Sequence, residues 1–357
     1  MYGGRSVIML SSNNYLGLAA HPRVKQAAIA AIERYGVGAG ASRLVAGNLE
    51  PLRRLEANLA RLKGAEAALV FGSGYLANLG TLTALMGPGD TIFSDELNHA
   101  SLIDGGRLAK ADLKIYRHCD TGHLKVLLEG SARARRRLIV TDSIFSMDGD
   151  FAPLREIVEL ARRFEAAIMV DEAHAVGVIG PDGAGLAAEL GLQHQIDIQM
   201  GTLSKALGAY GAYVAGASVL IEFLINRARS FIYTTGLPPP IAAAADAAVE
   251  IMRAEPERIR RLWDNAAHLR GRLEAAGFSF GATQSPILPL IIGAAQDAVN
   301  MAKRLFERGV YAIAIRPPTV PAGTARLRLT PIADHTRADL DEVIGSIIQC
   351  GRELKLI

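Results

Sequence analysis

The chain has few cysteines. Cys119 and Cys350 are the only two in 357 residues. They lie far apart, and no metal-ligand spacing surrounds either of them. Two isolated cysteines exclude a small disulfide-stabilised scaffold, which needs several closely spaced pairs. We therefore expect a protein of a reducing compartment, the cytoplasm, without a bound metal.

Long apolar runs and a targeting segment are also missing. The longest charge-free stretches, such as residues 206–221, are short and rich in glycine, so none of them predicts a membrane span. The N-terminus has no basic region followed by an apolar stretch and a small-residue cleavage site, so no signal peptide is visible. We expect no membrane partner.

Charge of one sign is not in excess. Lysine and arginine number 39 against 36 aspartate and glutamate residues, a net charge of +3, which is too small to indicate nucleic-acid binding. One dense basic cluster, in residues 133–137, precedes the apolar residues 138–140 and is interpreted as a solvated helix end. Half of the residues are hydrophobic, which is typical of a globular chain.

Apolar runs alternate with helical patterns over the first two thirds of the chain. This alternation predicts an α/β fold with a mainly parallel, seven-stranded sheet covered by helices. The expected strands are 67–71, 91–93, 113–116, 138–141, 167–171, 196–201 and 212–215.

The pattern changes after three consecutive prolines at 238–240. A long helical region, 241–275, is expected next, and the remaining expected elements are strands 287–292, 311–315 and 325–329 and helices 298–308 and from 337 onward. We expect three parts: an N-terminal segment 1–35, a large cofactor-binding domain 36–237 and a smaller α+β domain 238–357.

Three residue types along this chain together fit a pyridoxal phosphate (PLP) site. Lys205 lies in the small-residue stretch 201–208, where the backbone can approach a flat ring while the amine forms a Schiff base. Asp171 ends an apolar run, which places a carboxylate at the carboxyl end of a buried strand, where open α/β sheets bind ligands. His174 follows closely. Taken singly, a lysine in a glycine-rich loop is usually a surface residue, and Asp-Glu-Ala-His at 171–174 is as easily a helix cap or half of a metal site.

Cofactor chemistry gives each of these residues a role. Asp171 would keep the pyridine nitrogen protonated, because a carboxylate beside a cation favours the charged form. His174 would donate to the phenolic oxygen of the ring. Lys205 would hold the cofactor and then act as general base, and Thr202 would bind the phosphate.

Two loops after expected strands add polar groups. Residues 71–78 follow a strand and open a helix, so their free amides could hold a phosphate; a plain strand-to-helix turn is an equal interpretation. His99 lies among small polar residues, either as an ordinary loop histidine or stacked on the cofactor ring. Residues 143–150 offer hydroxyls, although this segment alone is a turn.

Motifs along nearly the whole chain resemble the α-oxoamine synthases. They include Ser-Ser-Asn-Asn-Tyr-Leu-Gly at 11–17, Val-Asp-Glu-Ala-His at 170–174 and Thr-Leu-Ser-Lys at 202–205. Members of this family are fold-type I PLP transferases that join an amino acid to an acyl-coenzyme A with loss of carbon dioxide. Residues 314–330 are most similar to the members that use L-alanine and a pimeloyl thioester.

The resemblance implies a set of site residues. Those that bind or act on the cofactor are Gly74, Tyr75, His99, Ser146, Asp171, His174, Thr202 and Lys205. The resemblance places Ser146 beside the ring oxygen and Thr319 in the substrate region. It makes Arg328 the partner of the carboxylate of the amino acid. The resemblance also implies a homodimer in which Thr234 reaches the phosphate of the neighbouring subunit.

This chain departs from the family pattern at three places. Members usually have a helical segment before the point where this sequence starts, so segment 1–35 is expected to be truncated. Asn14 stands where an aspartate is usual, and Leu52 where a histidine is common. These departures bear on substrate choice more than on reaction type.

The sequence also bears on functions other than this condensation. A dehydrogenase is excluded, because no Gly-x-Gly-x-x-Gly with a following acidic residue is present. A sister activity is the nearest alternative: glycine C-acetyltransferase, 5-aminolevulinate synthase or a serine-using acyltransferase. A non-catalytic partner subunit is the other alternative, and Lys205 argues against it because such subunits lose this lysine.

Overall fold

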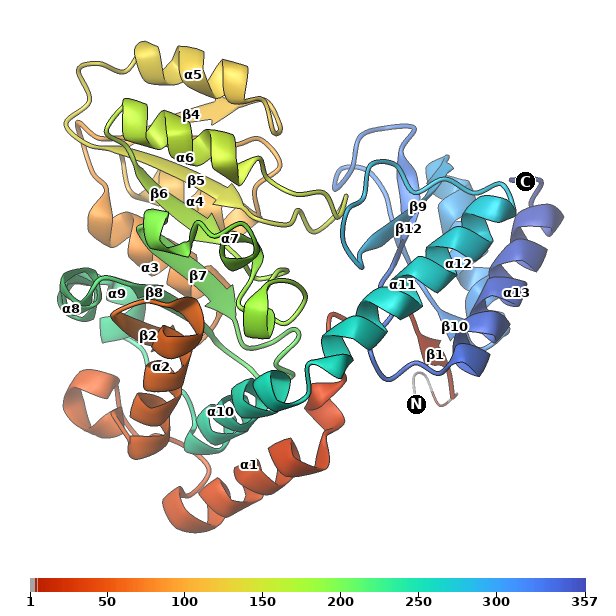
Figure 1. Cartoon of the computed structure of the whole chain (residues 1–357), viewed down its shortest axis with the longest axis horizontal. Helices are drawn as coiled ribbons and strands as arrows, with labels where there is room; N and C mark the ends of the chain where they lie inside the picture. Colours follow the sequence, from red (N-terminus) through yellow and green to blue (C-terminus); the bar gives the residue numbers. More distant parts are fainter. Residues whose placement is uncertain (1–3, 5) are drawn as a thin grey trace. The chain divides into compact units, whose positions relative to one another are not determined.

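The computed structural model describes residue 4 and residues 6–357. Residues 1–3 and 5, part of the expected segment 1–35, lie outside the described residues. The chain forms two compact units (Figure 1). The larger unit consists of Leu18–Phe145 and Ala152–Glu255. The smaller unit consists of the described residues up to Gly17, Ser146–Phe151 and Pro256–Ile357.

A seven-stranded sheet forms the centre of the larger unit, with strand order β2-β8-β7-β6-β5-β3-β4. Only β8 runs against its neighbours, so the expected mainly parallel sheet is confirmed. Most residues of these strands are buried, because helices cover both faces. The strands are β2 (Ala67–Phe71), β3 (Thr91–Asp95), β4 (Asp112–Tyr116), β5 (Arg137–Asp142), β6 (Ala167–Asp171), β7 (Ile198–Thr202) and β8 (Ala212–Gly216).

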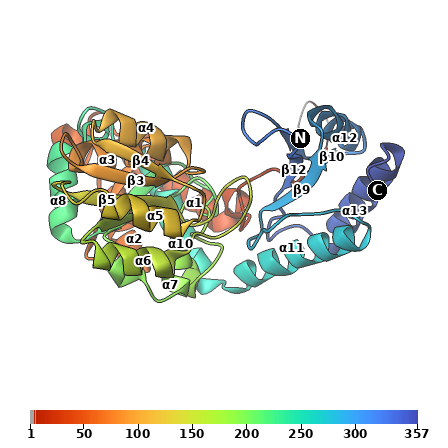
Figure 2. The same cartoon turned by 90° about the horizontal axis from the view of Figure 1, so that it is seen from above.

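Ten α-helices of the larger unit connect or flank these strands. They are α1 (Pro22–Tyr35), α2 (Glu50–Lys63), α3 (Gly74–Leu85), α4 (Ala100–Leu108), α5 (Thr121–Glu129), α6 (Leu154–Arg163), α7 (Leu186–Glu189), α8 (Ser218–Arg227), α9 (Arg229–Ile232) and α10 (Pro239–Ala254). Short helices of other types span Leu18–Ala20, Arg43–Gly47, Pro181–Gly183 and Gln193–Gln195. Figure 2 shows α3 and α4 on one side of the sheet and α5 and α6 on the other.

The smaller unit contains the end of the chain and a three-stranded antiparallel sheet in the order β11-β12-β9. Its strands are β9 (Leu288–Gly293), β11 (Ile313–Ile315) and β12 (Ala325–Leu329), and β1 (Ile8–Met9) pairs in parallel with β10 (Val310–Tyr311). Its helices are α11 (Glu257–Ala275), α12 (Ala295–Glu307) and α13 (Arg337–Glu353). Leucines and isoleucines from these elements form one apolar core.

The structure corrects two expected elements. The single helix expected over 241–275 is two helices, because α10 ends at Ala254 and α11 begins at Glu257. Pro256 causes the break, since it lacks an N–H and disfavours a helical conformation in the residue before it. The strand expected over 311–315 is also divided, into β10 and β11, which pair with different partners.

The two units divide the chain at residues other than the expected domain boundaries. Helix α10 packs against α1 and α2, so it belongs to the larger unit although it follows the three prolines. Among the described residues, no helix is both long and apolar enough to cross a membrane.

Candidate functional site

Polar side chains gather where neighbouring strands of the larger sheet end. Asp142 ends β5 and lies opposite Asp171, the last residue of β6, in the strand register. Thr202 ends β7, the next strand. Three adjacent strands therefore present a carboxyl, a carboxyl and a hydroxyl at one edge of the sheet, the position at which open α/β sheets bind ligands.

The Asp171 carboxylate is held by two donors. The side chain is only 3% exposed. Asn78 donates from Nδ2 to Oδ2 at 2.8 Å, and the Ala173 amide donates to Oδ1 at 2.9 Å. Because each oxygen accepts a hydrogen bond, the carboxylate cannot rotate freely and presents a fixed face to the site.

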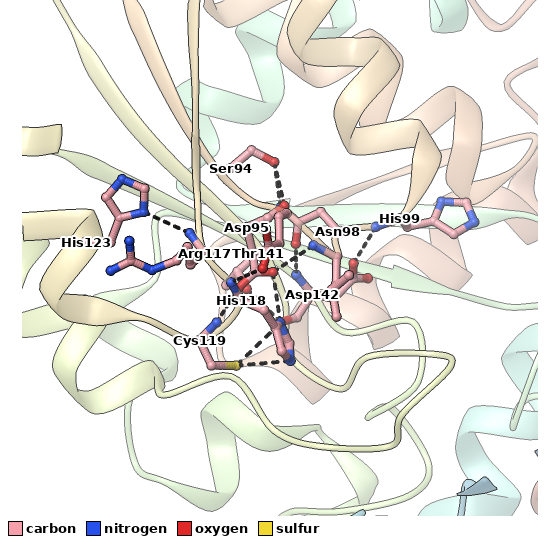
Figure 3. Close-up of polar contacts among 12 residues, drawn as sticks. Ser94, Asp95, Asn98, His99, Arg117, His118, Cys119, His123, Thr141 and Asp142 are labelled. Atoms are coloured by element: carbon pink, nitrogen blue, oxygen red, sulfur yellow. Dashed lines mark hydrogen bonds and ion pairs between the residues drawn. The ribbon is translucent and has the colours of Figure 1, made fainter. Parts of the chain in front are cut away.

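His99 is connected to Asp171 through a chain of hydrogen bonds. Asn78 Nδ2 also donates to the Ser101 hydroxyl at 2.8 Å, and that hydroxyl lies 2.8 Å from His99 Nδ1. The His99 amide donates to Asp142 Oδ2 at 2.7 Å (Figure 3). Burial lowers the pKa of His99, the charge of Asp171 raises it and the charge of Lys205 lowers it again. The net shift is downward, so the imidazole is neutral near pH 7 and suited to stacking.

Lys205 lies in the turn that follows β7. Its carbonyl accepts from the Gly208 amide at 2.9 Å, and Gly208 has φ +63°, a conformation that favours glycine. The positive charge of Lys205 lowers the pKa values of both His99 and Asp142. The ammonium group therefore lies in the same electrostatic environment as these two residues and Asp171.

Burial and the nearby Asp171 charge raise the pKa of Asp142 well above its ordinary value. A neighbouring negative charge disfavours ionisation of a buried carboxyl. Sequence analysis missed Asp142 and Asn78 as members of the site. No local motif marks them, since each acts through a partner distant in the sequence.

The first turn of α3 lies beside these residues. The Ser73 hydroxyl caps the helix by accepting from the Leu76 amide at 3.2 Å. A Cβ added to Gly74 would meet Met200 of β7 at 3.5 Å, so this turn packs close to the strand. Amides of a first helical turn have no partner within the helix. Gly74 and Tyr75 can therefore bind an anion such as a phosphate.

The remaining expected residues of the larger unit are Thr202, at the end of β7, and two residues on loops. The Thr202 hydroxyl lies 2.7 Å from that of Ser204 and donates to the Gly211 carbonyl at 3.0 Å. His174 is buried in the turns after β6, and Thr234 is partly exposed after α9. Ser143 directly follows Asp142 in the chain. Its hydroxyl is fully buried and makes no hydrogen bond within the described part of the chain.

The smaller unit holds the other three expected residues. Both arginines of β12 are buried: Arg328 is 6% exposed and Arg326 4%. Arg328 donates from Nε to the carbonyl of Ser146 and from Nη1 to Asn13 at 3.0 Å, whereas its Nη2 makes no hydrogen bond within the described residues. Thr319 is exposed in the loop before β12.

Arg326 differs from Arg328 in that its guanidinium is fully engaged. It pairs with Asp148 and donates to the Thr324 carbonyl at 3.0 Å and the Thr324 hydroxyl at 3.1 Å. Of these two arginines, Arg328 alone has a buried guanidinium nitrogen, Nη2, without a hydrogen bond in the described part of the chain. A carboxylate is the acceptor that a guanidinium binds best.

Comparison with known proteins identifies relatives along nearly the whole chain. Residues 5–347 match the aminotransferase class I and II family. An 8-amino-7-oxononanoate synthase of Anaeromyxobacter dehalogenans is 54% identical over 345 residues, which cover 97% of this chain and 86% of the relative. One of Geobacter sulfurreducens is 51% identical over 356 residues, 99% of this chain and 91% of the relative.

Solved structures share the fold. A serine palmitoyltransferase of Sphingomonas wittichii superposes with a TM-score of 0.97 at 33% identity, over 99% of this chain and 90% of that one. A serine palmitoyltransferase of S. paucimobilis with PLP and myriocin bound has a TM-score of 0.96 at 34% identity, with the same coverage of 99% and 90%. These likenesses confirm the fold-type I transferase fold and the resemblance drawn from the motifs. The chain belongs to the aminotransferase class I and II family.

Proposed function

We propose that this chain condenses L-alanine with a pimeloyl thioester, carried by coenzyme A or acyl carrier protein, to 8-amino-7-oxononanoate with release of carbon dioxide. This is a PLP-dependent step of biotin synthesis. The observation that carries the proposal is the 54% identity over 97% of the chain to a protein of that name.

The residues of the larger unit fit PLP. The buried carboxylate suits its pyridine nitrogen, and the imidazole of His99 suits its ring. The lysine suits its aldehyde, and the glycine-containing start of α3 suits its phosphate. The buried Ser143 hydroxyl has no partner among the described residues, as expected of a group that binds a ligand. Bound PLP supplies an electron sink for the electrons that remain on Cα when the carboxylate leaves.

The protein residues position that chemistry. Asp171, fixed by Asn78 and the Ala173 amide, holds a proton on the pyridine nitrogen. His99 would stack on the ring, and His174 and Ser146 would donate toward the ring oxygen. Lys205 would hold the cofactor through its aldehyde and would act as the general base that moves the proton at Cα of the amino acid. A positioned base of this kind contributes on the order of 10²–10⁴ in rate.

Phosphate and substrate have separate binding groups. Gly74, Tyr75 and Thr202 bind the cofactor phosphate through backbone amides and a hydroxyl. Arg328 binds the carboxylate of alanine with the Nη2 group that has no partner in the described residues. Thr319 contributes to binding of the acyl substrate.

We infer that the enzyme is a cytoplasmic homodimer, with Thr234 of each subunit reaching the phosphate in the other. Tyr233 beside it is 72% exposed. Tyrosines are enriched at protein–protein interfaces.

A serine-using acyltransferase is the second candidate, because the serine palmitoyltransferase structures superpose with a TM-score of 0.97. A substrate panel separates the two. We would measure turnover with alanine, glycine and serine, each against acetyl, succinyl, pimeloyl and palmitoyl thioesters. The proposal expects the highest kcat/KM for alanine with the pimeloyl thioester. A preference for serine with palmitoyl-coenzyme A would support the second candidate instead.

A further inference from the structure

A second cluster of polar side chains lies at the outer edge of the larger sheet (Figure 3). Asp95 is the last residue of β3 and pairs with Tyr116, the last residue of the edge strand β4. The turn after β4 carries His118 and Cys119. Parallel pairing of the two strands therefore brings a carboxylate, an imidazole and a thiol to one place.

The donor atoms are spaced as in a metal site. His118 Nδ1 lies 3.0 Å from Asp95 Oδ1, and Cys119 Sγ lies 3.7 Å from His118 Nε2. One ligand atom from each residue lies within 4.8 Å of the other two. Zinc bonds of about 2.0–2.3 Å in a tetrahedral arrangement place neighbouring ligand atoms about 3–4 Å apart. The cluster thus needs only small side-chain shifts to enclose an ion.

The surroundings fix all three side chains. The Asp95 carboxylate accepts from the Leu97 amide at 2.9 Å and from the Cys119 amide at 2.8 Å. The His118 ring packs edge-on against Phe145, with 4.4 Å between ring centroids. Cys119 has φ +54°, an uncommon conformation for a side-chain-bearing residue. Outer contacts of this kind orient metal ligands.

A fourth polar group lies beside the cluster. The Tyr116 side chain is 1% exposed, and its hydroxyl makes no hydrogen bond of normal length within the described residues.

We propose that Asp95, His118 and Cys119 bind one transition-metal ion of the zinc class, with water in the fourth position. Sulfur and nitrogen ligands select Zn²⁺ over Mg²⁺ or Ca²⁺, which prefer oxygen. The His118 side chain is 22% exposed, which gives the ion a route from solvent. No metal was expected from the sequence, because Asp95 comes from a different strand and lies too far along the chain from Cys119 to form a recognisable metal-ligand motif.

The ion has a structural consequence for the candidate active site. Asp95 begins the turn that leads to Asn98 and His99. The Asn98 side chain connects this turn to β5: its Oδ1 accepts from the Asp142 amide at 2.9 Å, and its Nδ2 donates to the Val140 carbonyl at 2.9 Å. An ion on Asp95 fixes the start of the same turn. It stabilises the segment without taking part in the proposed condensation, so the two proposals stand independently.

The test is metal stoichiometry in the PLP-loaded protein. Chelator-treated wild type is dialysed against Zn²⁺, and bound metal is counted by mass spectrometry and by competition with a chromogenic chelator. We expect one Zn²⁺ per chain. Cys119→Asn should weaken binding at least about 10-fold; asparagine tolerates a positive φ, so this variant loses the thiol while keeping the backbone.

Matched variants and a second readout make the result specific. Cys350→Ala removes the other thiol, which lies in the smaller unit, and His123→Gln removes a nearby histidine outside the cluster; both should bind like wild type. Zn²⁺ should also protect Cys119 from alkylation by iodoacetamide. Equal Zn²⁺ affinity in Cys119→Asn and wild type, or a reactive Cys119 in wild type that binds no Zn²⁺, would overturn the proposal.

Discussion

Two arginines of one strand differ in the hydrogen bonds that their guanidinium groups make. Alternation along 325–329 places Arg326 and Arg328 on one face, and from the sequence that face could be solvated. In the structure both are buried. Arg326 is fully engaged by Asp148 and Thr324, whereas Arg328 keeps one N–H group without a partner among the described residues.

We predict that Arg328→Lys weakens alanine binding by about 1–3 kcal/mol, the scale of hydrogen bonds to a charged group, because lysine lacks the planar fork. The measurement is the KM or Kd for alanine, with the visible absorption of the cofactor unchanged. Arg326→Lys is the matched control. Equal losses from both substitutions would remove the case for a specific clamp at Arg328.

Asn78 is a residue that sequence analysis could not assign. We predict that Asn78→Ala lowers kcat about 10-fold, which corresponds to loss of one charged hydrogen bond of about 1.4 kcal/mol, because Asp171 loses its Oδ2 donor. Steady-state kinetics and the pH dependence of the cofactor spectrum check this. Thr81→Ala, a buried change in the same helix, serves as control. An unchanged kcat and spectrum in Asn78→Ala would show that Asn78 does not position Asp171.

Helix α2 is joined to the segment beside Asp171 by a buried ion pair. Lys63, its last residue, contacts Glu172 and the Ala184 carbonyl, and Glu172 also accepts from the Ala187 amide at 2.9 Å. Both charged side chains are completely buried. Breaking such a pair leaves an uncompensated charge in the interior.

We predict that Lys63→Met lowers the free energy of unfolding by about 3–5 kcal/mol, measured as a shift in the urea or thermal midpoint. The double variant Lys63→Met with Glu172→Gln should regain part of that loss, because it removes the stranded charge. If Lys63→Met is as stable as wild type, the pair does not hold α2 to this segment.

Several elements could be predicted from local sequence and others could not. The strands 67–71, 167–171 and 325–329 were predicted with their observed bounds, because short apolar runs end sharply at turn residues. The break between α10 and α11 was missed, although Pro256 is a local signal, because helix-forming residues such as alanine and arginine are frequent on both sides of it. Asn78 and Asp142 were missed because their partners come from other strands and helices, which only the folded chain brings together.

Assembly is the property of the whole molecule on which the proposed site depends. If Thr234 reaches the phosphate of the other subunit, cofactor binding and dimer formation stabilise each other by mass action. We predict that dilution into the range of dimer dissociation releases the cofactor, as followed by analytical ultracentrifugation with absorbance detection. Thr234→Ala should release it at higher protein concentration than wild type. Thr235→Ala is the control. Thr235 contacts Ser42 through a backbone β-bridge, which an alanine side chain leaves intact, so this variant should behave like wild type. A monomer that retains cofactor and full activity would contradict the shared site.

The fate of the alanine carboxylate distinguishes the proposed reaction from the transamination that the family name suggests. Protein incubated with L-alanine labelled with carbon-13 in the carboxylate and with pimeloyl-coenzyme A should release labelled carbon dioxide and form unlabelled 8-amino-7-oxononanoate in equal amounts, both measured by mass spectrometry. Lys205→Ala should do neither. Label that stays in the organic product, or that appears in pyruvate, would contradict decarboxylative condensation by this chain.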